Sequence, residues 1–241
     1  MGSATPLVQI DGTQPLTYQH GVPYGEAFGF SVAGGFDIGG PLGALDGVPD
    51  LVIGSPLFNV DASIPNAELS LAGRVRAFSV DLNAPLGQEV TPLLVDSPVI
   101  DGTVMIGANP GDQFGYSVTC LADIDNDGGP EILGGAWQAA IDIASVCPPL
   151  PDPLPRTALG GYAAMYSSGS NPPGAKRAIF YGEKVRDHMG RAVDAENLYG
   201  TSSRPEIVLS GLGWSPQGAV SGVNTELGKG FIWDGDMVML P

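Results

Sequence analysis

The chain has 241 residues, and its 26 Asp and Glu against 10 Lys and Arg give a formal net charge of -16. This acidity repels nucleic-acid phosphates and attracts divalent cations, and no apolar stretch is long enough to cross a bilayer, so neither nucleic-acid binding nor membrane insertion is expected. Its 36 Gly and 22 Pro, with no long stretch of helical periodicity, predict an all-β protein rich in turns.

Short segments rich in Val, Ile and Phe recur along the chain, each bounded by Gly, Pro, Asn or Asp, and predict antiparallel strands. In chain order they fall at 28–33, 50–54, 74–80 and 104–107, then at 114–119, 131–134, 161–166 and 178–181, then at 191–193, 206–210, 230–233 and 237–240. Four short strands to a group is the anatomy of a propeller blade, in which antiparallel sheets pack radially. We therefore predict an all-β β-propeller of four-stranded antiparallel blades, with about three blades in this chain.

Three stretches, which begin at Gly25, Gly111 and Arg186, are variants of one another. Each opens with an aromatic or Met residue followed by Gly, runs through a polar loop, and closes on an acidic residue before a β-branched run. Self-similarity at a long period indicates stacked units that share a core, so we predict a single domain. The domain covers residues 1–241, with blades at about 22–107, 108–182 and 183–241 and an N-terminal strand at 15–21 left to complete another blade.

The longest connections follow the acidic strand in each repeat, at 57–73, 138–160 and 212–229. In repeat proteins such insertions lie on one face, which is often the binding face. We predict that these loops bind a protein or glycan ligand. Trp137 and Trp214 flank two of them, and we expect these side chains either in that binding surface or in the packing between blades.

An alternating run of acids in the second repeat has the spacing of a calcium-binding loop. Asp123, Asp125 and Asp127 alternate, and Glu131 follows Asp127 after a turn that contains glycine. Ca²⁺ takes roughly six to eight oxygen ligands from flexible loops of this kind, and the Gly129 carbonyl would supply one of them. We predict a Ca²⁺ site here, and the alternative is an Asp-rich turn held by hydrogen bonds from its own side chains.

The first repeat keeps the end of this pattern in Asp46, Val48 and Asp50, but an insertion places its first acid, Asp37, too early. The carboxylates of Asp37, Asp46 and Asp50 with the Val48 carbonyl form a second candidate Ca²⁺ site. In the third repeat only Glu206 remains acidic at a ligand position, and we predict no ion there.

Together these motifs resemble the FG-GAP repeat of integrin α-subunit propellers and of many bacterial secreted and surface proteins. The resemblance rests on Phe28-Gly29 with 50–54 and on Phe114-Gly115 with 123–131, whereas Met189-Gly190 begins a degenerate third copy. It implies a calcium-binding β-propeller that is secreted or exposed at the cell surface, with its ions in loops between the strands of a blade. In integrins the ligand binds on the face away from those ions. The chain differs from the family in its longer repeats and smaller number of copies.

Three blades do not close a ring, and the open sheet edges of a partial ring must be covered or paired. The chain is either a piece of a longer propeller, or it contains a divergent fourth blade, or two copies close one ring about a two-fold axis. The left-over strand at 15–21 favours two copies, so we expect a homo-oligomer or a part of a larger assembly. The same contact without closure would build a fibre.

The preferred functional prediction is a non-catalytic, calcium-stabilised extracellular module for adhesion, recognition or protein assembly. The chain has only two His, His20 and His188, and it lacks both a Gly-x-Ser-x-Gly motif and a paired-His zinc spacing. The alternatives are a structural subunit of a sheath, fibre or virion assembled through propeller edges, and a hydrolase or lyase acting on glycans or phosphate esters. Cys120 and Cys147 are either bridged or two free buried thiols.

Overall fold

The computed structural model describes residues 17–19, 22–38, 45, 47–58, 71–80, 90–94, 111–139, 160–168, 175–182, 186–198, 204–213 and 228–234. Within these stretches the chain forms thirteen strands and no helix, which confirms the all-β prediction. A helix with the length and apolarity to span a membrane is therefore absent from the described residues.

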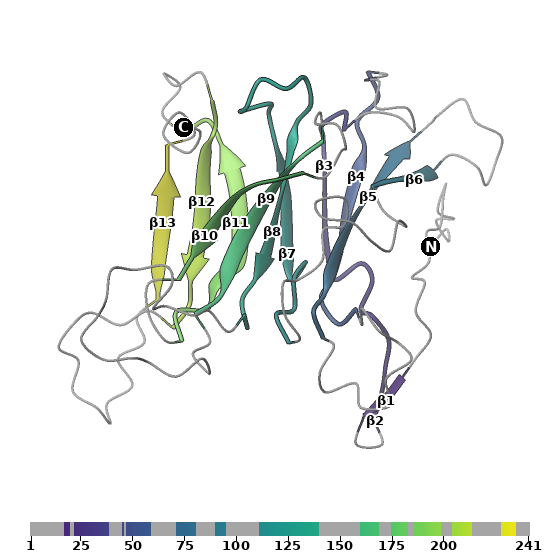
Figure 1. Ribbon diagram of the computed structural model, residues 1–241, viewed down its shortest axis with the longest axis vertical. Helices are drawn as coiled ribbons and strands as arrows, with labels where there is room; N and C mark the ends of the chain where they lie inside the picture. Colours follow the sequence, from purple (N-terminus) through teal and green to yellow (C-terminus); the bar gives the residue numbers. More distant parts are fainter. Residues whose placement is uncertain are drawn as a thin grey trace, which may run out of the picture.

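Three antiparallel sheets stand side by side, and a short hairpin lies apart from them (Figure 1). The hairpin pairs β1 (Thr17–Gln19) with β2 (Val22–Tyr24). The first sheet contains β3 (Ser31–Gly34), β4 (Leu51–Ser55), β5 (Arg74–Val80) and β6 (Val90–Leu94). The second contains β7 (Ser117–Leu121), β8 (Glu131–Ala136), β9 (Tyr162–Ser167) and β10 (Ala175–Tyr181). The third contains β11 (Met189–Glu196), β12 (Glu206–Gly211) and β13 (Lys229–Trp233).

In each of the three sheets the strands lie in chain order, so each sheet is an up-and-down meander. The three long connections each join the second strand of a sheet to the third, which is the equivalent position that the sequence predicted. Neighbouring sheets meet through their first strands, because β7 contacts both β3 and β11. The described strands follow one another in this way without closing into a ring.

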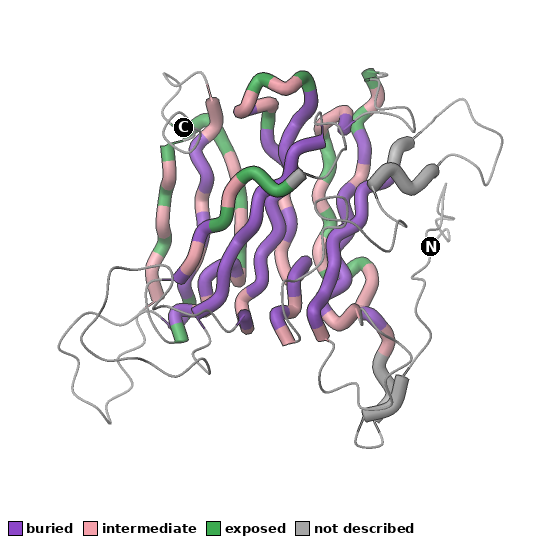
Figure 2. Tube along the Cα trace, in the orientation of Figure 1, coloured by how far each residue is buried: buried purple, intermediate pink, exposed green. Residues whose placement is uncertain are grey.

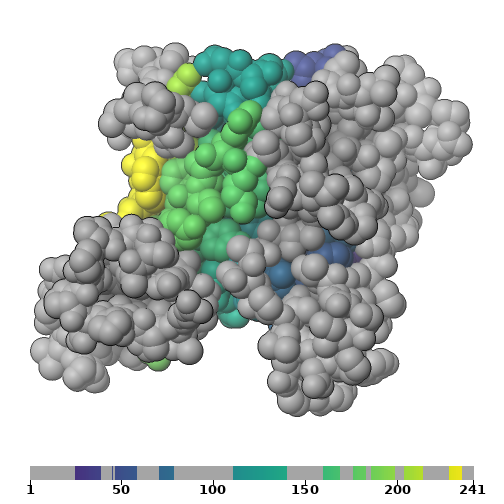
Figure 3. Space-filling model, viewed as in Figure 1, coloured from purple at the N-terminus to yellow at the C-terminus, as the bar shows by residue number. Residues whose placement is uncertain are grey.

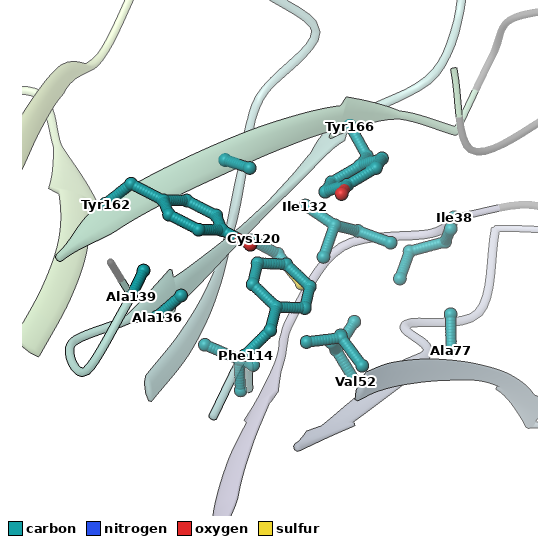
Figure 4. Close-up of a cluster of buried hydrophobic side chains, with 13 residues drawn as sticks. Ile38, Val52, Ala77, Phe114, Cys120, Ile132, Ala136, Ala139, Tyr162 and Tyr166 are labelled. Carbon is teal, nitrogen blue, oxygen red and sulfur yellow. The ribbon is translucent and has the colours of Figure 1, made fainter. Parts of the chain in front are cut away.

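Two apolar cores fill the spaces between neighbouring sheets, since the side chains of a strand alternate between its two faces. Figure 4 shows the Phe114 ring at the centre of the core between the first and second sheets, with Tyr162 and Ile132 from the second and Val52 from the first around it. The core between the second and third sheets contains Leu121, Ile124, Leu133, Ala163, Met165, Phe180, Met189, Ile207 and Leu209. The second sheet is thus covered on both faces.

Burial differs between the middle of this arrangement and its two sides. Every residue of β8 and β9 is buried, whereas β3 and β13 alternate between half-buried and exposed (Figure 2). Because burying one large apolar side chain contributes roughly 1.5–3 kcal/mol, the second sheet carries most of the stabilising contacts. It also holds the acidic loop between β7 and β8.

The same hydrogen bonds recur at both junctions between sheets. One joins two backbones, and the other comes from a serine hydroxyl near the start of a sheet's first strand. The backbone bonds run from the Phe114 N–H to the Ala72 carbonyl (2.8 Å) and from the Met189 N–H to the Gly160 carbonyl (2.9 Å). The serine bonds run from Ser31 Oγ to the Gly115 carbonyl (2.8 Å) and from Ser117 Oγ to the Gly190 carbonyl (2.9 Å). The sequence repeats are therefore structural repeats, and their Phe-Gly and Met-Gly pairs join one sheet to the next.

Two glycines make room for these junctions. A Cβ at Gly54 would overlap the Gly115 carbonyl of the next sheet, and a Cβ at Gly135 would overlap the Gly190 carbonyl. The third sheet has Ser210 at the equivalent position in β12, and its Oγ accepts a hydrogen bond from the backbone of β11 at 3.0 Å. The third sheet therefore has a side chain where the first two sheets have a bare glycine against the neighbouring backbone.

The predicted strand at 15–21 contains β1, which pairs with β2 in a hairpin. That this strand completes another blade stays a prediction. One strand of the first sheet differs from the predicted set. The fourth strand of the first sheet is β6, which was not predicted because it contains Pro92. Pro is tolerated there because β6 lies at the edge of its sheet. The predicted strands at 104–107 and 237–240 lie outside the described residues.

Cys120 in β7 is a buried free thiol. Burial, helped by the negative charge of Asp50, raises the pKa of this thiol to about 12. The thiol therefore stays protonated at physiological pH and packs as a small apolar group. Cys147 lies outside the described residues.

Candidate metal centre

The acidic loop of the second repeat connects β7 to β8 at the upper end of the second sheet in Figure 1. Asn126 and Gly128 adopt positive φ values of 59° and 98°, which turn the chain back on itself. Asn tolerates this left-handed conformation better than most residues, and Gly adopts it without strain. No atom lies near the missing Cβ of Gly128, so this glycine serves the turn and not a close contact.

The turn brings four carboxylates together, those of Asp123, Asp125, Asp127 and Glu131, which we call the acidic cluster. One oxygen of each lies within 4.8 Å of one oxygen of every other. The three Asp are half-buried, and Glu131 is completely buried. Among the described residues this is the one group of three or more potential ligand side chains, and it can hold a metal ion.

Backbone N–H groups of the loop fix most of the aspartate oxygens. The Asp127 N–H donates hydrogen bonds to Asp123 Oδ1 (3.2 Å) and Asp125 Oδ1 (3.0 Å). The Gly128 N–H donates to Asp123 Oδ2 (3.0 Å), and the Gly129 N–H donates to Asp127 Oδ1 (3.2 Å). Gly129, whose carbonyl is a predicted ligand, is buried within the loop. The loop therefore has the hydrogen bonds of an Asp-rich turn together with the carboxylate grouping of a metal site.

Glu131 is the most constrained member of the acidic cluster. Its Oε2 accepts a hydrogen bond from the Ile124 N–H at 2.9 Å, while its Oε1 is buried and has no hydrogen-bond partner. Burial raises the pKa of Glu131 to about 8, the charges of Asp125 and Asp123 act in the same direction, and the backbone N–H groups of Ile124 and Asp125 oppose them. A cation in the cluster would supply the missing partner for Oε1.

Two side chains that the sequence did not mark also reach the acidic cluster. Ser167 Oγ, at the end of β9, donates a hydrogen bond to Asp127 Oδ2. Arg177 of β10 lies with Nε 2.7 Å from Asp125 Oδ2 and with Nη2 2.8 Å from Asp127 Oδ2. Ser167 and Arg177 follow Asp127 by 40 and 50 residues. Because they are so distant in sequence, no local pattern predicts these contacts.

The pKa values of the two aspartates shift in opposite directions, because burial dominates at Asp125 and the hydrogen bonds from Ser167 and Arg177 dominate at Asp127. Burial is the main cause that raises the pKa of Asp125, and it outweighs the Asp127 N–H and the Arg177 charge, which lower it. Burial also acts on Asp127, but the hydrogen bonds from Ser167 and Arg177 together hold its pKa below the ordinary value. The positive charge nearest to the cluster therefore favours the ionised form of both groups.

All three repeats use their closing acid in the same structural role. In each, a carboxylate oxygen accepts a hydrogen bond from a backbone N–H at the start of the loop. The three bonds are Ile38 N to Asp50 Oδ2 (2.7 Å), Ile124 N to Glu131 Oε2 (2.9 Å) and Leu198 N to Glu206 Oε2 (2.7 Å). This bond exists in the third repeat, where no ion is predicted, so the closing acid shapes the loop whether or not a metal is present.

The candidate site of the first repeat is described in part. Asp50 is buried, Val48 is half-buried, and Asp37 Oδ2 accepts a hydrogen bond from the Gly47 N–H at 2.5 Å. Asp46 lies outside the described residues. The Ca²⁺ site predicted from Asp37, Asp46, Val48 and Asp50 therefore stays a prediction.

The opposite end of the second sheet contains Trp137, one of the two residues predicted for a recognition surface. Its half-buried ring lies with its centroid 5.2 Å from Tyr116 and 5.1 Å from His188, and the Arg191 guanidinium lies 4.6 Å from its centre. Trp137 Nε1 donates to Gln113 Oε1 at 3.1 Å. These contacts join the second and third repeats, so they fit the packing alternative. Trp214 and His20 lie outside the described residues.

No known family model matches this chain, and no curated protein matches it either. The resemblance to FG-GAP repeats therefore rests on the motifs themselves. The geometry of the acidic cluster is the firmest basis for a function.

Proposed function

We propose that this chain is a non-catalytic, calcium-stabilised module of propeller-like sheets that acts outside the cytoplasm in adhesion, recognition or protein assembly. The observation that carries the proposal is the acidic cluster, in which Glu131 Oε1 is buried without a hydrogen-bond partner. Burying a carboxylate oxygen without a partner is costly, and a bound cation would remove that cost.

The chemistry of the ligands favours calcium. All four side chains of the acidic cluster are carboxylates, and hard cations prefer such oxygen donors, whereas zinc prefers His and Cys. Magnesium demands a near-ideal octahedron, but a loop built on turns at Asn126 and Gly128 adjusts more readily to the irregular shell of calcium. The place outside the cytoplasm follows from the resemblance to FG-GAP repeats, and calcium loops of extracellular modules are of the weak kind that fills at extracellular calcium concentrations.

A structural role fits the position of the acidic cluster better than catalysis does. The loop joins β7 to β8, and Ser167 at the end of β9 reaches the cluster as well. An ion here would therefore hold three strands of the second sheet together at one end. The Asp123 oxygens and the Oδ1 atoms of Asp125 and Asp127 are bonded to the loop backbone, which fits ligands fixed in place and not groups that exchange protons with a substrate.

The propeller itself is a part of this proposal. Three meander sheets whose first strands are neighbours fit the radial arrangement of blades, and the junction bonds repeat from one sheet to the next. We infer that the sheets are blades near 22–107, 108–182 and 183–241. The ligand would bind through loops 57–73, 138–160 and 212–229, which lie for the most part outside the described residues.

Calcium dependence of stability tests the proposal directly. With calcium at about 100 to 1,000 times its dissociation constant, linkage adds roughly 3–4 kcal/mol to the unfolding free energy. For a chain of this size we expect the melting temperature to rise by about 6–16 °C over the value in EGTA. Asp125→Asn should lose most of this rise, because it removes the charge of one ligand. The measurement is thermal denaturation followed by circular dichroism, with calcium and magnesium compared.

The matched control is Glu196→Gln, which removes one negative charge from an exposed position in β11. This variant should keep the full calcium response of the natural chain. If calcium leaves the melting temperature of the natural chain unchanged, the calcium proposal is wrong. A rise that Asp125→Asn retains would place the ion somewhere other than the acidic cluster.

A structural subunit is the second candidate, and one observation favours it. Val32 in β3 is 59% exposed and Ile232 in β13 is 53% exposed, so the first and last sheets both present apolar side chains to solvent. Because Ser210 fills the receiving position of the third sheet, copies that meet there would pack differently from the internal junctions. Light scattering with and without calcium measures the assembly, and a monodisperse monomer in both conditions would contradict it.

A further inference from the structure

A β-bulge in the outer strand of the second sheet directs one positive charge at the acidic cluster. The pairing of β10 with β9 shifts register between Lys176 and Ala178, so Arg177 is the extra residue on the bulged strand. Bulges of this kind change the direction of a side chain. Here the Arg177 guanidinium reaches both Asp125 and Asp127 from an edge strand that is distant in sequence.

The oxygens that Arg177 contacts are those that the loop backbone leaves available. Asp125 Oδ1 and Asp127 Oδ1 each accept a backbone N–H of the loop, and the Oδ2 atoms of the same two residues carry the ion pairs with Arg177. The third available oxygen is Glu131 Oε1, which is buried without a hydrogen-bond partner. A cation bound in the cluster would need these same oxygens.

Burial makes these ion pairs stronger than ordinary surface pairs. The side chains of Asp125 and Asp127 are 6% and 17% exposed, and that of Arg177 is 32% exposed. Charges this close and partly shielded from water interact more strongly than exposed ones. A divalent cation and a guanidinium that contact the same two oxygens repel each other, because both are positively charged.

We propose that Arg177 is a built-in competitor of the metal ion, which neutralises Asp125 and Asp127 in the metal-free protein and is displaced when a cation binds. This inference rests on the proposed function, because it needs the acidic cluster to bind a cation. Metal binding then breaks the link between the acidic loop and β10 and returns a positive charge to the outer edge of the second sheet. In Figure 3 the loop forms part of the teal surface at the top of the molecule, and the green surface below it includes β10.

Competition has two consequences that differ from those of a supporting residue. The arginine lowers the affinity of the cluster for the cation, because ion pairs must break before the cation binds. By thermodynamic reciprocity the cation weakens the contact of Arg177 with the loop by the same factor. A residue that stabilised the metal-bound loop would show the opposite sign in both measurements.

The test compares Arg177→Gln with Lys176→Gln by calorimetric titration with calcium. Lys176 is the preceding residue of the same strand and carries the same charge, but its Nζ lies 5.7 Å from the Tyr166 ring centroid and not at the loop. Both variants lose one positive charge from the acidic chain, so their difference isolates the contact with the cluster. We expect Arg177→Gln to bind calcium about tenfold more tightly than Lys176→Gln, since two partly buried ion pairs no longer oppose binding.

Nuclear magnetic resonance of the natural chain provides a second measurement that needs no variant to fold. The Arg177 Nε–H signal, assigned by its loss in Arg177→Gln, should be protected without metal and should lose that protection when calcium is added. Binding that is equal in the two variants, or weaker in Arg177→Gln, would overturn the proposal while the calcium site stands. If none of the three chains binds calcium, the proposed calcium site falls together with this inference.

Discussion

The second repeat closes its loop with Glu131 and the third repeat closes its loop with Glu206, and both carboxylates accept a hydrogen bond from a backbone N–H at the loop start. The second loop adds three aspartates that gather around the closing acid. The third loop, with one acid at these positions, keeps the same bond and also joins two antiparallel strands, although the pairing of β11 with β12 shifts register between Met189 and Val193. The two repeats therefore separate the closing acid, which accepts a backbone hydrogen bond in both loops, from the three aspartates, which only the candidate metal centre contains.

The same two repeats also differ at the junction position. Gly135 of the second repeat lies against the Gly190 carbonyl of the third sheet, and Ser210 fills the equivalent position in the third repeat with its own side chain. The equivalent position is therefore a close backbone contact between two sheets in the second repeat and a side-chain hydrogen bond within one sheet in the third.

Exchanging the junction residues should have the largest effect. Gly135→Ser would place a Cβ against the Gly190 carbonyl, and because both groups belong to packed backbone, neither can move away easily. We expect the unfolding free energy to fall by about 3 kcal/mol or more, which urea denaturation measures. The reciprocal change Ser210→Gly loses one hydrogen bond to the backbone of β11, so it should cost only about 1 kcal/mol. Equal losses in the two variants would contradict the distinction between a close backbone contact at Gly135 and a side-chain hydrogen bond at Ser210.

Replacing each closing acid with glutamine tests whether its charge is needed for stabilisation by calcium or only its hydrogen bond for the shape of the loop. Glu131→Gln keeps an acceptor for the Ile124 N–H but removes a charge from the acidic cluster, so we expect it to reduce the stabilisation by calcium by about 2 kcal/mol. Glu206→Gln keeps the equivalent bond to Leu198 and should leave the calcium response unchanged. Urea denaturation with calcium and with EGTA measures both variants. A calcium response that depends on Glu206 would show that the third loop also holds an ion.

The smallest effect concerns Cys120, which faces the core between the first and second sheets. Because burial raises the pKa of its thiol to about 12, iodoacetamide should not label it in the folded protein at pH 8 but should label it in urea. Above about pH 9 the unfolded chain loses the thiol proton while the folded chain keeps it, so stability should fall as the pH rises towards 12. A variant with Cys147→Ser leaves one thiol to follow by mass spectrometry. Rapid labelling under native conditions would mean that the two sheets separate easily.

The predicted strands are most accurate where local sequence and tertiary environment agree. The runs at 74–80 and 206–210 correspond closely to β5 and β12, because β-branched residues between turn residues leave no competing structure. β6 was missed, since Pro92 argues against a strand unless the strand lies at an edge, and the position of a strand within its sheet is a tertiary property. The segment 15–21 contains β1, whereas β2, its partner in the hairpin, was not predicted from the sequence.

The sequence alone determined the all-β class, the three repeats and the grouping of Asp123, Asp125, Asp127 and Glu131, because turn chemistry and ligand spacing act over a few residues. Tertiary structure decided which oxygens of the acidic cluster remain available and which positive charge reaches them. Arg177 comes to the cluster through the pairing of β10 with β9 and the bulge in it. The close approach that makes Gly135 indispensable likewise exists only once two sheets have packed together, so no local pattern reveals it.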